Sequence, residues 1–261
     1  MLTEIQRSLL ADRLEAAERM REPIPPLIET YPQLTAADAY EIQLHNIRRR
    51  ASPTVGHKVG LSSLAMQQMM GVNEPDYGHL LADMRLDEDV PVDAERYCYP
   101  RVEIEVAFIL GADLPGEDCT EQDVLAATRA FAPSIELIDS RILDWRISIV
   151  DTIADNASSA GFVVGAARVA PADIEIKTID AMLTRNGEVV AQGRSDAVLG
   201  NPVTAVAWLA RTVARFGVRL HAGHVILPGA CARAVDVAPG DKFHATFTGL
   251  GSVSLSFQEA S

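Results

Sequence analysis

The chain has 261 residues, 48% of them hydrophobic and 23% charged, a composition that supports a folded protein with a sizeable buried core. Its formal net charge of -13 opposes binding to the phosphates of nucleic acid or to an anionic membrane surface, so we expect neither as a main partner. Three widely spaced cysteines without a CxxC pair argue against a disulfide framework, and the N-terminus lacks the apolar segment of a signal peptide, so a cytoplasmic location is expected.

The N-terminal part of the chain, up to about residue 85, is predicted to be mainly helical. Apolar residues recur at helical spacing near the start, and prolines at positions 23, 25 and 26 end this pattern. Thr35 is a candidate N-cap for the next helix. In chain order we expect helices over 3–21 and 35–47, a strand over 55–61, a short helix over 64–70 and a loop over 71–79.

The remainder, from about residue 86 to residue 261, is predicted to be rich in strands. We expect helices over about 120–131 and 202–216, and strands over 101–110, 134–138, 161–165, 181–186, 188–192, 225–227, 242–247 and 252–257. Hairpins outnumber alternating βαβ units, which predicts an α+β fold with a mixed or antiparallel sheet. The boundary near 85–100 is weak, so we interpret 1–261 as a single catalytic domain.

Glu103 and Glu105 form the first candidate functional pair. Residues two apart on a strand point to the same face, so both carboxylates would lie side by side, opposite a row of apolar neighbours. A solvent-exposed face also tolerates such a pair, and spacing alone leaves that alternative open. Glu136, however, stands within an otherwise apolar strand, where an isolated carboxylate needs a partner. A shared divalent cation would satisfy all three, and oxygen-only ligation favours Mg²⁺ or Mn²⁺ over zinc.

Lys58 is the second candidate, because it lies on a short apolar strand between glycines that allow close backbone approach. A lysine in a cleft can bind a substrate carboxylate or exchange protons. The alternative from spacing alone is an edge-strand lysine that faces water. His57 would point to the opposite face and is interpreted as structural. Two polar segments add weaker candidates, one containing Asp76 and one containing Ser158.

Several common catalytic motifs are missing from the sequence. It contains no glycine-rich phosphate loop, no GxSxG elbow, no HExxH motif and no Cys/His metal cluster. These absences narrow the expected chemistry to acid–base or metal-assisted catalysis on a small molecule.

A series of ordered motifs resembles the hydratase/decarboxylase family of the fumarylacetoacetase-like superfamily. The residues that carry the resemblance are Gly56-His57-Lys58-Val59-Gly60-Leu61-Ser62, Glu74-Pro75-Asp76-Tyr77-Gly78, Arg101-Val102-Glu103-Ile104-Glu105, Ser134-Ile135-Glu136, Asp155-Asn156-Ala157-Ser158-Ser159 and Leu199-Gly200-Asn201-Pro202. The match covers essentially residues 35–257. One departure is Gly229-Ala230, where many relatives have Gly-Ser, so a hydroxyl contact to substrate is missing there.

The resemblance implies a fold, a set of site residues and an activity. The implied fold is a mixed β-roll with flanking helices, usually assembled as a homo-oligomer. The implied ligands of Mg²⁺ or Mn²⁺ are Glu103, Glu105 and Glu136. Lys58 matches the active-site lysine, and Asp76 and Ser158 fall in segments that line the pocket. The implied activity is hydration of 2-hydroxypenta-2,4-dienoate to 4-hydroxy-2-oxopentanoate in aromatic or steroid meta-cleavage catabolism, directly before an aldolase that is a candidate partner.

Other functions stay open at this point. A 4-oxalocrotonate (2-oxo-3-hexenedioate) decarboxylase of the same family would share the three glutamates and Lys58. A C–C bond hydrolase or an isomerase of the superfamily is a more distant alternative, as is a non-catalytic subunit that supports a neighbouring pathway enzyme. The pocket's tolerance for a second substrate carboxylate would separate the hydratase from the decarboxylase.

Overall fold

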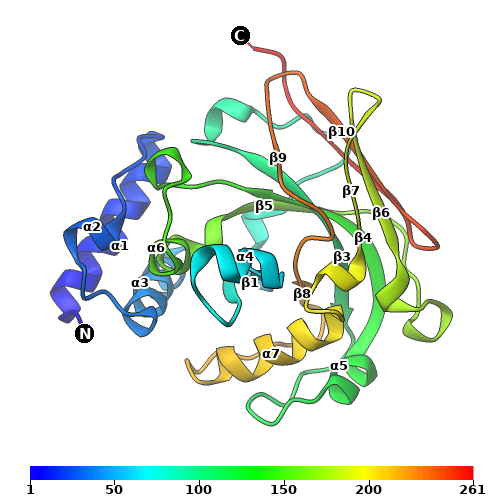
Figure 1. Cartoon of the computed structure of the whole chain (residues 1–261), viewed down its shortest axis with the longest axis horizontal. Coiled ribbons are helices and arrows are strands. Elements are labelled where there is room, and N and C mark those ends of the chain that lie inside the picture. The colour runs from blue at the N-terminus through cyan, green and yellow to red at the C-terminus, as the bar shows by residue number, and fades with distance from the viewer. Residues whose placement is uncertain (261) are drawn as a thin grey trace.

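The computed structural model describes residues 1–260 and begins with a helical layer. Three helices from the N-terminal part pack with one from the middle of the chain on the same side of the molecule (Figure 1): α1 (Glu4–Met20), α2 (Leu27–Thr30), α3 (Ala36–Arg49) and α6 (Ile149–Ala154). Thr3 and Thr35 cap α1 and α3, each in a reciprocal capping box with the residue three positions later. The two long helices therefore begin at the positions that the sequence predicts.

The main sheet contains seven strands and is mixed, as predicted. Its path runs β2-β1-β8-β3-β4-β5, and β9 pairs with β3 off this path. The strands are β1 (Thr54–Gly60), β2 (Asp76–Leu81), β3 (Arg101–Leu110), β4 (Thr128–Ile138), β5 (Ser159–Val164), β8 (Val225–Leu227) and β9 (Val235–Asp236). Only the pair β1 and β8 is parallel among the pairs of this sheet in the described chain. The edge strands β2 and β5 contact each other, so the sheet curls into a roll.

A second sheet and two helices close the core. The spatial order of the four strands in this sheet is β11-β10-β6-β7. They are β6 (Asp180–Arg185), β7 (Glu188–Arg194), β10 (Lys242–Phe247) and β11 (Gly251–Ser256). Strand β11 packs on β4, and α7 (Pro202–Ala214) packs beside α5 (Glu121–Ala127). Figure 1 shows this sheet on the side of the roll away from α1. A short helix, α4 (Leu64–Met70), follows β1.

The two faces of β3 have different roles. Val102, Ile104 and Val106 are fully buried in the main hydrophobic core. Glu103 and Glu105 alternate with them and so point to the opposite face. Farther along that face, Ala107 and Ile109 join a smaller apolar cluster that includes Phe162 and Leu227. The polar site therefore lies beside an apolar patch on one face of a single curled sheet.

Two expected elements were wrong in type or extent. Residues 71–79 were expected to be a loop, but Asp76–Leu81 form β2, whose six residues are all buried and pair with β1. Gly78 serves close packing there, because a Cβ atom on it would lie 2.3 Å from the carbonyl oxygen of Asn156. The helix expected over 120–131 ends at Ala127, since Thr128 already pairs with Leu110 and pairing along β3 overrides local helix propensity. Within residues 1–260, no helix is long and apolar enough to span a lipid bilayer.

The capping box of α3 gives a test of this local structure. Replacing Thr35 by Ala removes the acceptor for the Asp38 backbone N–H and is expected to lower the free energy of unfolding by about 1 kcal/mol. The measurement is urea unfolding followed by far-ultraviolet circular dichroism. Thr30, an exposed residue at the end of α2, supplies the matched control as Thr30→Ala. Equal midpoints for the two variants would show that the cap contributes nothing.

Candidate metal centre

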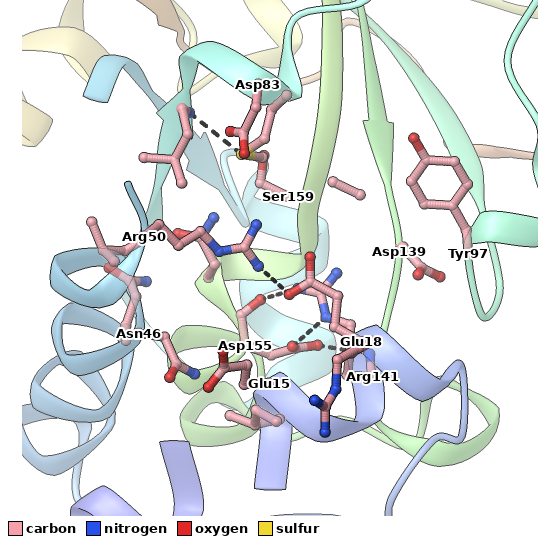
Figure 2. Close-up of a pocket in the computed structure, with 18 of the residues that line it drawn as sticks. Glu15, Glu18, Asn46, Arg50, Asp83, Tyr97, Asp139, Arg141, Asp155 and Ser159 are labelled. Atoms are coloured by element: carbon pink, nitrogen blue, oxygen red, sulfur yellow. Dashed lines mark hydrogen bonds and ion pairs between the residues drawn. The ribbon is translucent and has the colours of Figure 1, made fainter. Parts of the chain in front are cut away.

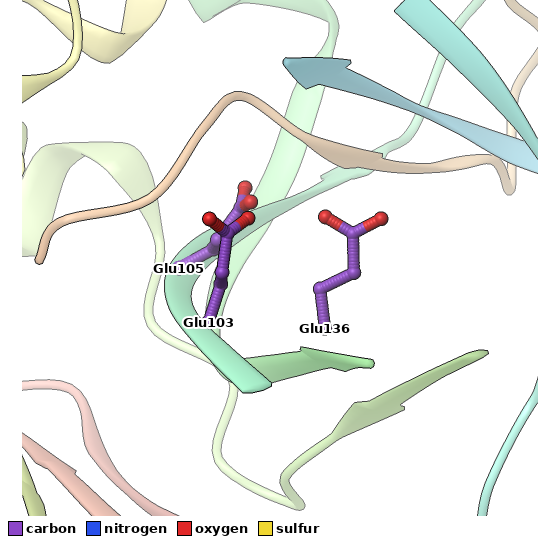
Figure 3. Close-up of side chains that lie close together, drawn as sticks. All are labelled: Glu103, Glu105 and Glu136. Atoms are coloured by element: carbon purple, nitrogen blue, oxygen red, sulfur yellow. The ribbon is translucent and has the colours of Figure 1, made fainter. Parts of the chain in front are cut away.

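Three glutamates converge on the polar face of the main sheet. Glu103 and Glu136 are direct cross-strand partners on β3 and β4, and Glu105 follows two residues along β3. One carboxylate oxygen from each lies within 4.8 Å of the others. Figure 3 shows the three side chains rising from the strands in the same direction, with the carboxyl groups of Glu103 and Glu105 facing that of Glu136. The structure thus brings together the three carboxylates that the sequence singled out.

These carboxylates lie in a strongly unfavourable environment for negative charge. Glu105 and Glu136 are fully buried, whereas Glu103 is partly exposed. Burial, followed by the charges of Glu136 and Glu103, raises the pKa of Glu105 well above its usual value. Burial also raises the pKa of Glu136 to about 7, although the nearby Lys58 ammonium opposes the rise. The alternative of an exposed, solvated pair at positions 103 and 105 is therefore wrong for Glu105.

Unpaired oxygen atoms at this site fit a divalent cation. Oε1 of Glu105 and both Oε atoms of Glu136 are buried without a hydrogen-bond partner, and buried polar atoms of this kind normally have one. Oε2 of Glu105 accepts a hydrogen bond of 2.7 Å from the backbone N–H of Gly229, which fixes that side chain. Three converging carboxylates without nitrogen or sulfur ligands suit a hard cation such as Mg²⁺ or Mn²⁺. The donor set can hold such an ion.

Lys58 projects from β1 into the same site. Its side chain is buried, with Nζ 3.4 Å from Oε2 of Glu136 and 3.0 Å from the carbonyl oxygen of Ala157, to which it donates a hydrogen bond. Burial opposes the ammonium charge, but the surrounding carboxylates, Glu136 first, raise the pKa of Lys58. Lys58 therefore carries a positive charge at neutral pH. The alternative of an edge-strand lysine facing water is wrong, because β1 lies between β2 and β8.

Asp76 completes the charged cluster from β2. It lies opposite Gly60 in the β1–β2 pair, and a Cβ atom at position 60 would lie 2.1 Å from Oδ1 of Asp76. Both carboxylate oxygens are buried without a hydrogen-bond partner. Burial raises the pKa of Asp76, and Lys58 opposes the rise. Because Gly60 has no side chain, the Asp76 carboxyl group fits next to it, near Nζ of Lys58.

Ser158 is less closely tied to the three glutamates. It is buried, and its Oγ lies 3.4 Å from Oγ1 of Thr152. Its backbone belongs to the segment that meets Lys58, since the preceding residue, Ala157, supplies the carbonyl oxygen. The structure therefore places Ser158 in the segment that meets Lys58 through Ala157, with its side chain next to Thr152.

His57 points to the opposite face of the sheet, as its position next to Lys58 predicts. Its ring lies 4.7 Å from that of His79 and 5.9 Å from that of His224, and neither ring nitrogen has a hydrogen-bond partner. Burial lowers the pKa of His57 well below its usual value, so the ring is neutral at physiological pH. His57 packs within the core and does not reach the glutamates.

A separate cavity of about 530 Å³ lies between the N-terminal helices and the sheet. Figure 2 shows charged side chains around it, including the buried Arg141, which donates hydrogen bonds to Asp155 at 2.5 and 2.9 Å. None of the three glutamates lines this cavity, but Ser159 and Asn156 do. The cavity therefore reaches the segment that follows α6.

Sequence reasoning missed three features of the site. The Gly229 N–H that holds Glu105 comes from a segment in which the sequence indicated only a missing hydroxyl group. Thr152, on α6, had no motif that marked it. No local pattern predicted the Arg141–Asp155 ion pair. The polar run 155–159 did indicate a candidate functional segment. Each feature depends on contacts between distant parts of the chain.

Known proteins resemble this chain along nearly its whole length. The family model described as fumarylacetoacetate (FAA) hydrolase C-terminal matches residues 83–257. A 2-keto-4-pentenoate hydratase of Paraburkholderia xenovorans is 42% identical over 260 residues, covering 98% of this chain and 97% of the relative. A 2-hydroxyhexa-2,4-dienoate hydratase of Comamonas testosteroni is 41% identical over 252 residues, covering 95% and 96%.

A solved structure gives the same family and fold. The 4-oxalocrotonate decarboxylase from Pseudomonas putida G7, complexed with magnesium and adipate, superposes with a TM-score of 0.94 at 37% sequence identity, covering 98% of this chain and 99% of that chain. The mixed sheet with a helical N-terminal part is thus the fold of that enzyme. As its motifs predicted, this chain belongs to the fumarylacetoacetate hydrolase family, in the group of the 2-keto-4-pentenoate hydratases and 4-oxalocrotonate decarboxylases.

Proposed function

We propose that this chain is a hydro-lyase that converts 2-hydroxypenta-2,4-dienoate to 4-hydroxy-2-oxopentanoate with a divalent cation held by Glu103, Glu105 and Glu136. The observation that carries the proposal is the convergence of three carboxylates, among which Oε1 of Glu105 and both Oε atoms of Glu136 are buried without a hydrogen-bond partner. Relatives named 2-keto-4-pentenoate hydratase, at 42% identity over almost the whole chain, support the choice of reaction.

Mg²⁺ or Mn²⁺ is the proposed cation, since a related enzyme was crystallised with magnesium and the donor atoms here are all oxygens. When bound, such a cation would stabilise, as a Lewis acid, the negative charge that develops on the C2 oxygen next to the substrate's C1 carboxylate. The three glutamates would hold the ion. The Gly229 N–H keeps Glu105 oriented during this role.

Lys58 supplies a fixed positive charge beside the glutamates. Its ammonium group lies within reach of Glu136 and is held by the Ala157 carbonyl oxygen, so one of its three hydrogens remains free for substrate. We assign to Lys58 the orientation of the substrate carboxylate and of the C2 oxygen by hydrogen bonds from its ammonium group, which its raised pKa keeps protonated. Burial of the side chain keeps water away from this charge.

Asp76 is the proposed carrier of the proton for C5. Its raised pKa makes the protonated carboxyl group more accessible than in an ordinary aspartate, and this group can donate a proton to C5. The enol O–H proton then passes to the Asp76 carboxylate and restores its acid form, which leaves an α,β-unsaturated ketone. Water then adds at C4 and its second proton goes to C3, so one water molecule is gained overall. Ser158, beside Lys58, is assigned a role in placing that water.

The 4-oxalocrotonate decarboxylases remain the second candidate because one is 39% identical to this chain. Their substrate has a second carboxylate, which needs a cation or several donors at the far end of the pocket. In the described chain, Lys58 and Arg101 are the cations that influence the four site carboxylates. Arg101 already pairs with Asp236 at 2.7 Å and stacks over Trp145. The preference for the hydratase therefore rests on the relatives named 2-keto-4-pentenoate hydratase.

The direct test follows the ultraviolet absorbance of 2-hydroxypenta-2,4-dienoate with purified protein. Treatment with EDTA should abolish turnover, and added Mg²⁺ or Mn²⁺ should restore it, with 4-hydroxy-2-oxopentanoate as the product identified by mass spectrometry. Release of carbon dioxide from 2-oxo-3-hexenedioate, without hydration of the dienoate, would replace the hydratase by the decarboxylase. Absence of turnover with both substrates would overturn the proposal that the chain is this enzyme.

Replacing Glu105 by Gln tests the ligand assignment. The amide oxygen can still accept the hydrogen bond from the Gly229 N–H, but the negative charge of the ligand is lost. Mutation of residues that only support a metal ligand typically lowers activity by roughly 10–100-fold, so loss of a ligand charge should lower it at least as much. The metal-free variant should unfold at no lower a temperature than the metal-free wild type, because it loses a carboxyl group whose ionisation burial disfavours, and added Mg²⁺ should no longer raise that temperature. Glu188, exposed on β7, provides the control as Glu188→Gln. Full activity in folded Glu105→Gln protein would refute the assignment.

Metal affinity should depend on pH. Glu136 has a pKa of about 7 and Glu105 a pKa well above its usual value in the metal-free protein, so cation binding must displace protons. Affinity is therefore greatest above these pKa values and weakens as the pH falls, by about tenfold per pH unit for each proton displaced. Calorimetric titration with Mn²⁺ at pH 6, 7 and 8, in buffers of different ionisation enthalpy, measures both affinity and proton release. The same affinity at pH 6 and pH 8 would contradict the raised pKa values.

A further inference from the structure

The segment between α6 and β5 has an unusual backbone. Asn156, Ala157 and Ser158 have φ angles of 54°, 50° and 58°, so three successive residues other than glycine adopt the left-handed conformation. Each such residue costs roughly 1–2 kcal/mol relative to the right-handed form. A conformation of this kind persists only where surrounding contacts hold it in place.

Asn156 makes the contacts that hold the middle of this segment. Its Oδ1 accepts a hydrogen bond of 2.8 Å from the backbone N–H of His79, and its Nδ2 donates one of 3.0 Å to the carbonyl oxygen of the same residue. His79 lies on β2, an edge strand of the main sheet. The Asn156 side-chain amide therefore bonds the outer edge of β2 as the backbone of another strand would. Gly78 has no side chain and so leaves space for the backbone of Asn156.

The residue after Asn156 touches the proposed active site. The carbonyl oxygen of Ala157 accepts the 3.0 Å hydrogen bond from Nζ of Lys58. The ammonium group's other short contact is with Glu136 at 3.4 Å. Because the lysine side chain is long and flexible, the carbonyl oxygen decides where the ammonium group stands. The direction of that carbonyl oxygen depends in turn on the left-handed backbone.

A second anchor lies one residue before Asn156. Asp155 accepts hydrogen bonds from Nε and the backbone N–H of Arg141, and its carbonyl oxygen accepts from Nη2 at 2.6 Å. This anchor does not involve Asn156. The Ser158 N–H also donates a 3.0 Å hydrogen bond to the carbonyl oxygen of Asp155, and the Asp139 N–H donates one of 2.8 Å to that of Ser158. Loss of the Asn156 amide should therefore leave the segment attached and shift the Ala157 carbonyl oxygen rather than release it.

We propose that Asn156 is a positioning residue: by bonding both backbone groups of His79, it aims the Ala157 carbonyl oxygen at the Lys58 ammonium and so sets the position of that group for catalysis. The catalytic part of this proposal rests on the hydratase function proposed above. The positional part stands on the geometry alone.

Asn156→Gly is the principal test, because glycine adopts the left-handed backbone without strain but lacks the amide. The chain has three lysines, and Lys177 and Lys242 are exposed, so protein labelled with [ε-¹³C]lysine should give a separable Lys58 signal. At fixed pH that signal should shift or broaden in the variant while the other two stay in place. In the dienoate assay, kcat should fall by about 10- to 100-fold with a much smaller change in KM. Mn²⁺ affinity should be unchanged.

The matched control is Asn186→Gly in the turn between β6 and β7. Asn186 also has a left-handed φ, of 55°, and its side chain also bonds neighbouring residues, but it lies in the four-stranded sheet. This variant should keep the Lys58 signal and kcat of the wild type. Asn156→Asp is a second test if Asn156→Gly does not fold, since it keeps the acceptor for the His79 N–H and loses the donor to its carbonyl oxygen.

The outcomes separate this proposal from the proposed function. An unchanged Lys58 signal and unchanged kcat in both Asn156 variants would overturn the positioning role. A parallel loss of Mn²⁺ affinity would also overturn it, because the residue would then support the fold as a whole. If the wild type lacks hydratase activity, the proposed function fails, and the lysine signal still decides whether Asn156 positions Lys58.

Discussion

The burial of like charges is the constraint on which the rest of this structure depends. Glu103, Glu105, Glu136 and Asp76 stand in one site with a single buried ammonium group, that of Lys58. One ammonium group cannot neutralise four carboxylates. Each unpaired buried ion costs several kcal/mol, so the cluster is unfavourable when all four carboxyl groups are ionised. Burial first, and the charges of neighbouring carboxylates second, raise the pKa values of Glu105 and Glu136. A divalent cation would relieve this excess of negative charge, and in the proposed function the same cation would act as the Lewis acid.

The curled sheet is what makes such a cluster possible. Lys58 on β1 and Glu136 on β4 are separated by β8 and β3 in the sheet, yet their charged atoms are 3.4 Å apart. At about 4.8 Å between neighbouring strands, a flat sheet would keep the two backbones roughly 14 Å apart. Curling brings the side chains of one face toward each other. Apolar residues on the other face, in the main core, stabilise the curved shape.

The sequence predicted the parts of the site that follow local rules. The two-residue period of a strand placed Glu103 and Glu105 together, and an apolar context marked Glu136 as unusual. The burial of Lys58 could not be predicted, because it depends on which strands flank β1. Strand β2 was missed because Pro75 and Gly78 are typical turn residues, while its pairing with β1 is decided by tertiary contacts. The support from Gly229 and Arg141 is also non-local.

Ala157 shows how the site and the stability of the chain are linked. Alanine is a poor residue for a φ of 50°, and its methyl group forms no hydrogen bond that could favour it. Its conformation must therefore be imposed by the neighbours that are bonded to β2 and to Arg141. Glycine would adopt this backbone more easily, but it would also leave the segment more mobile. A strained alanine between two anchored residues gives a carbonyl oxygen with one fixed direction, and that oxygen is the one that receives the hydrogen bond from Lys58.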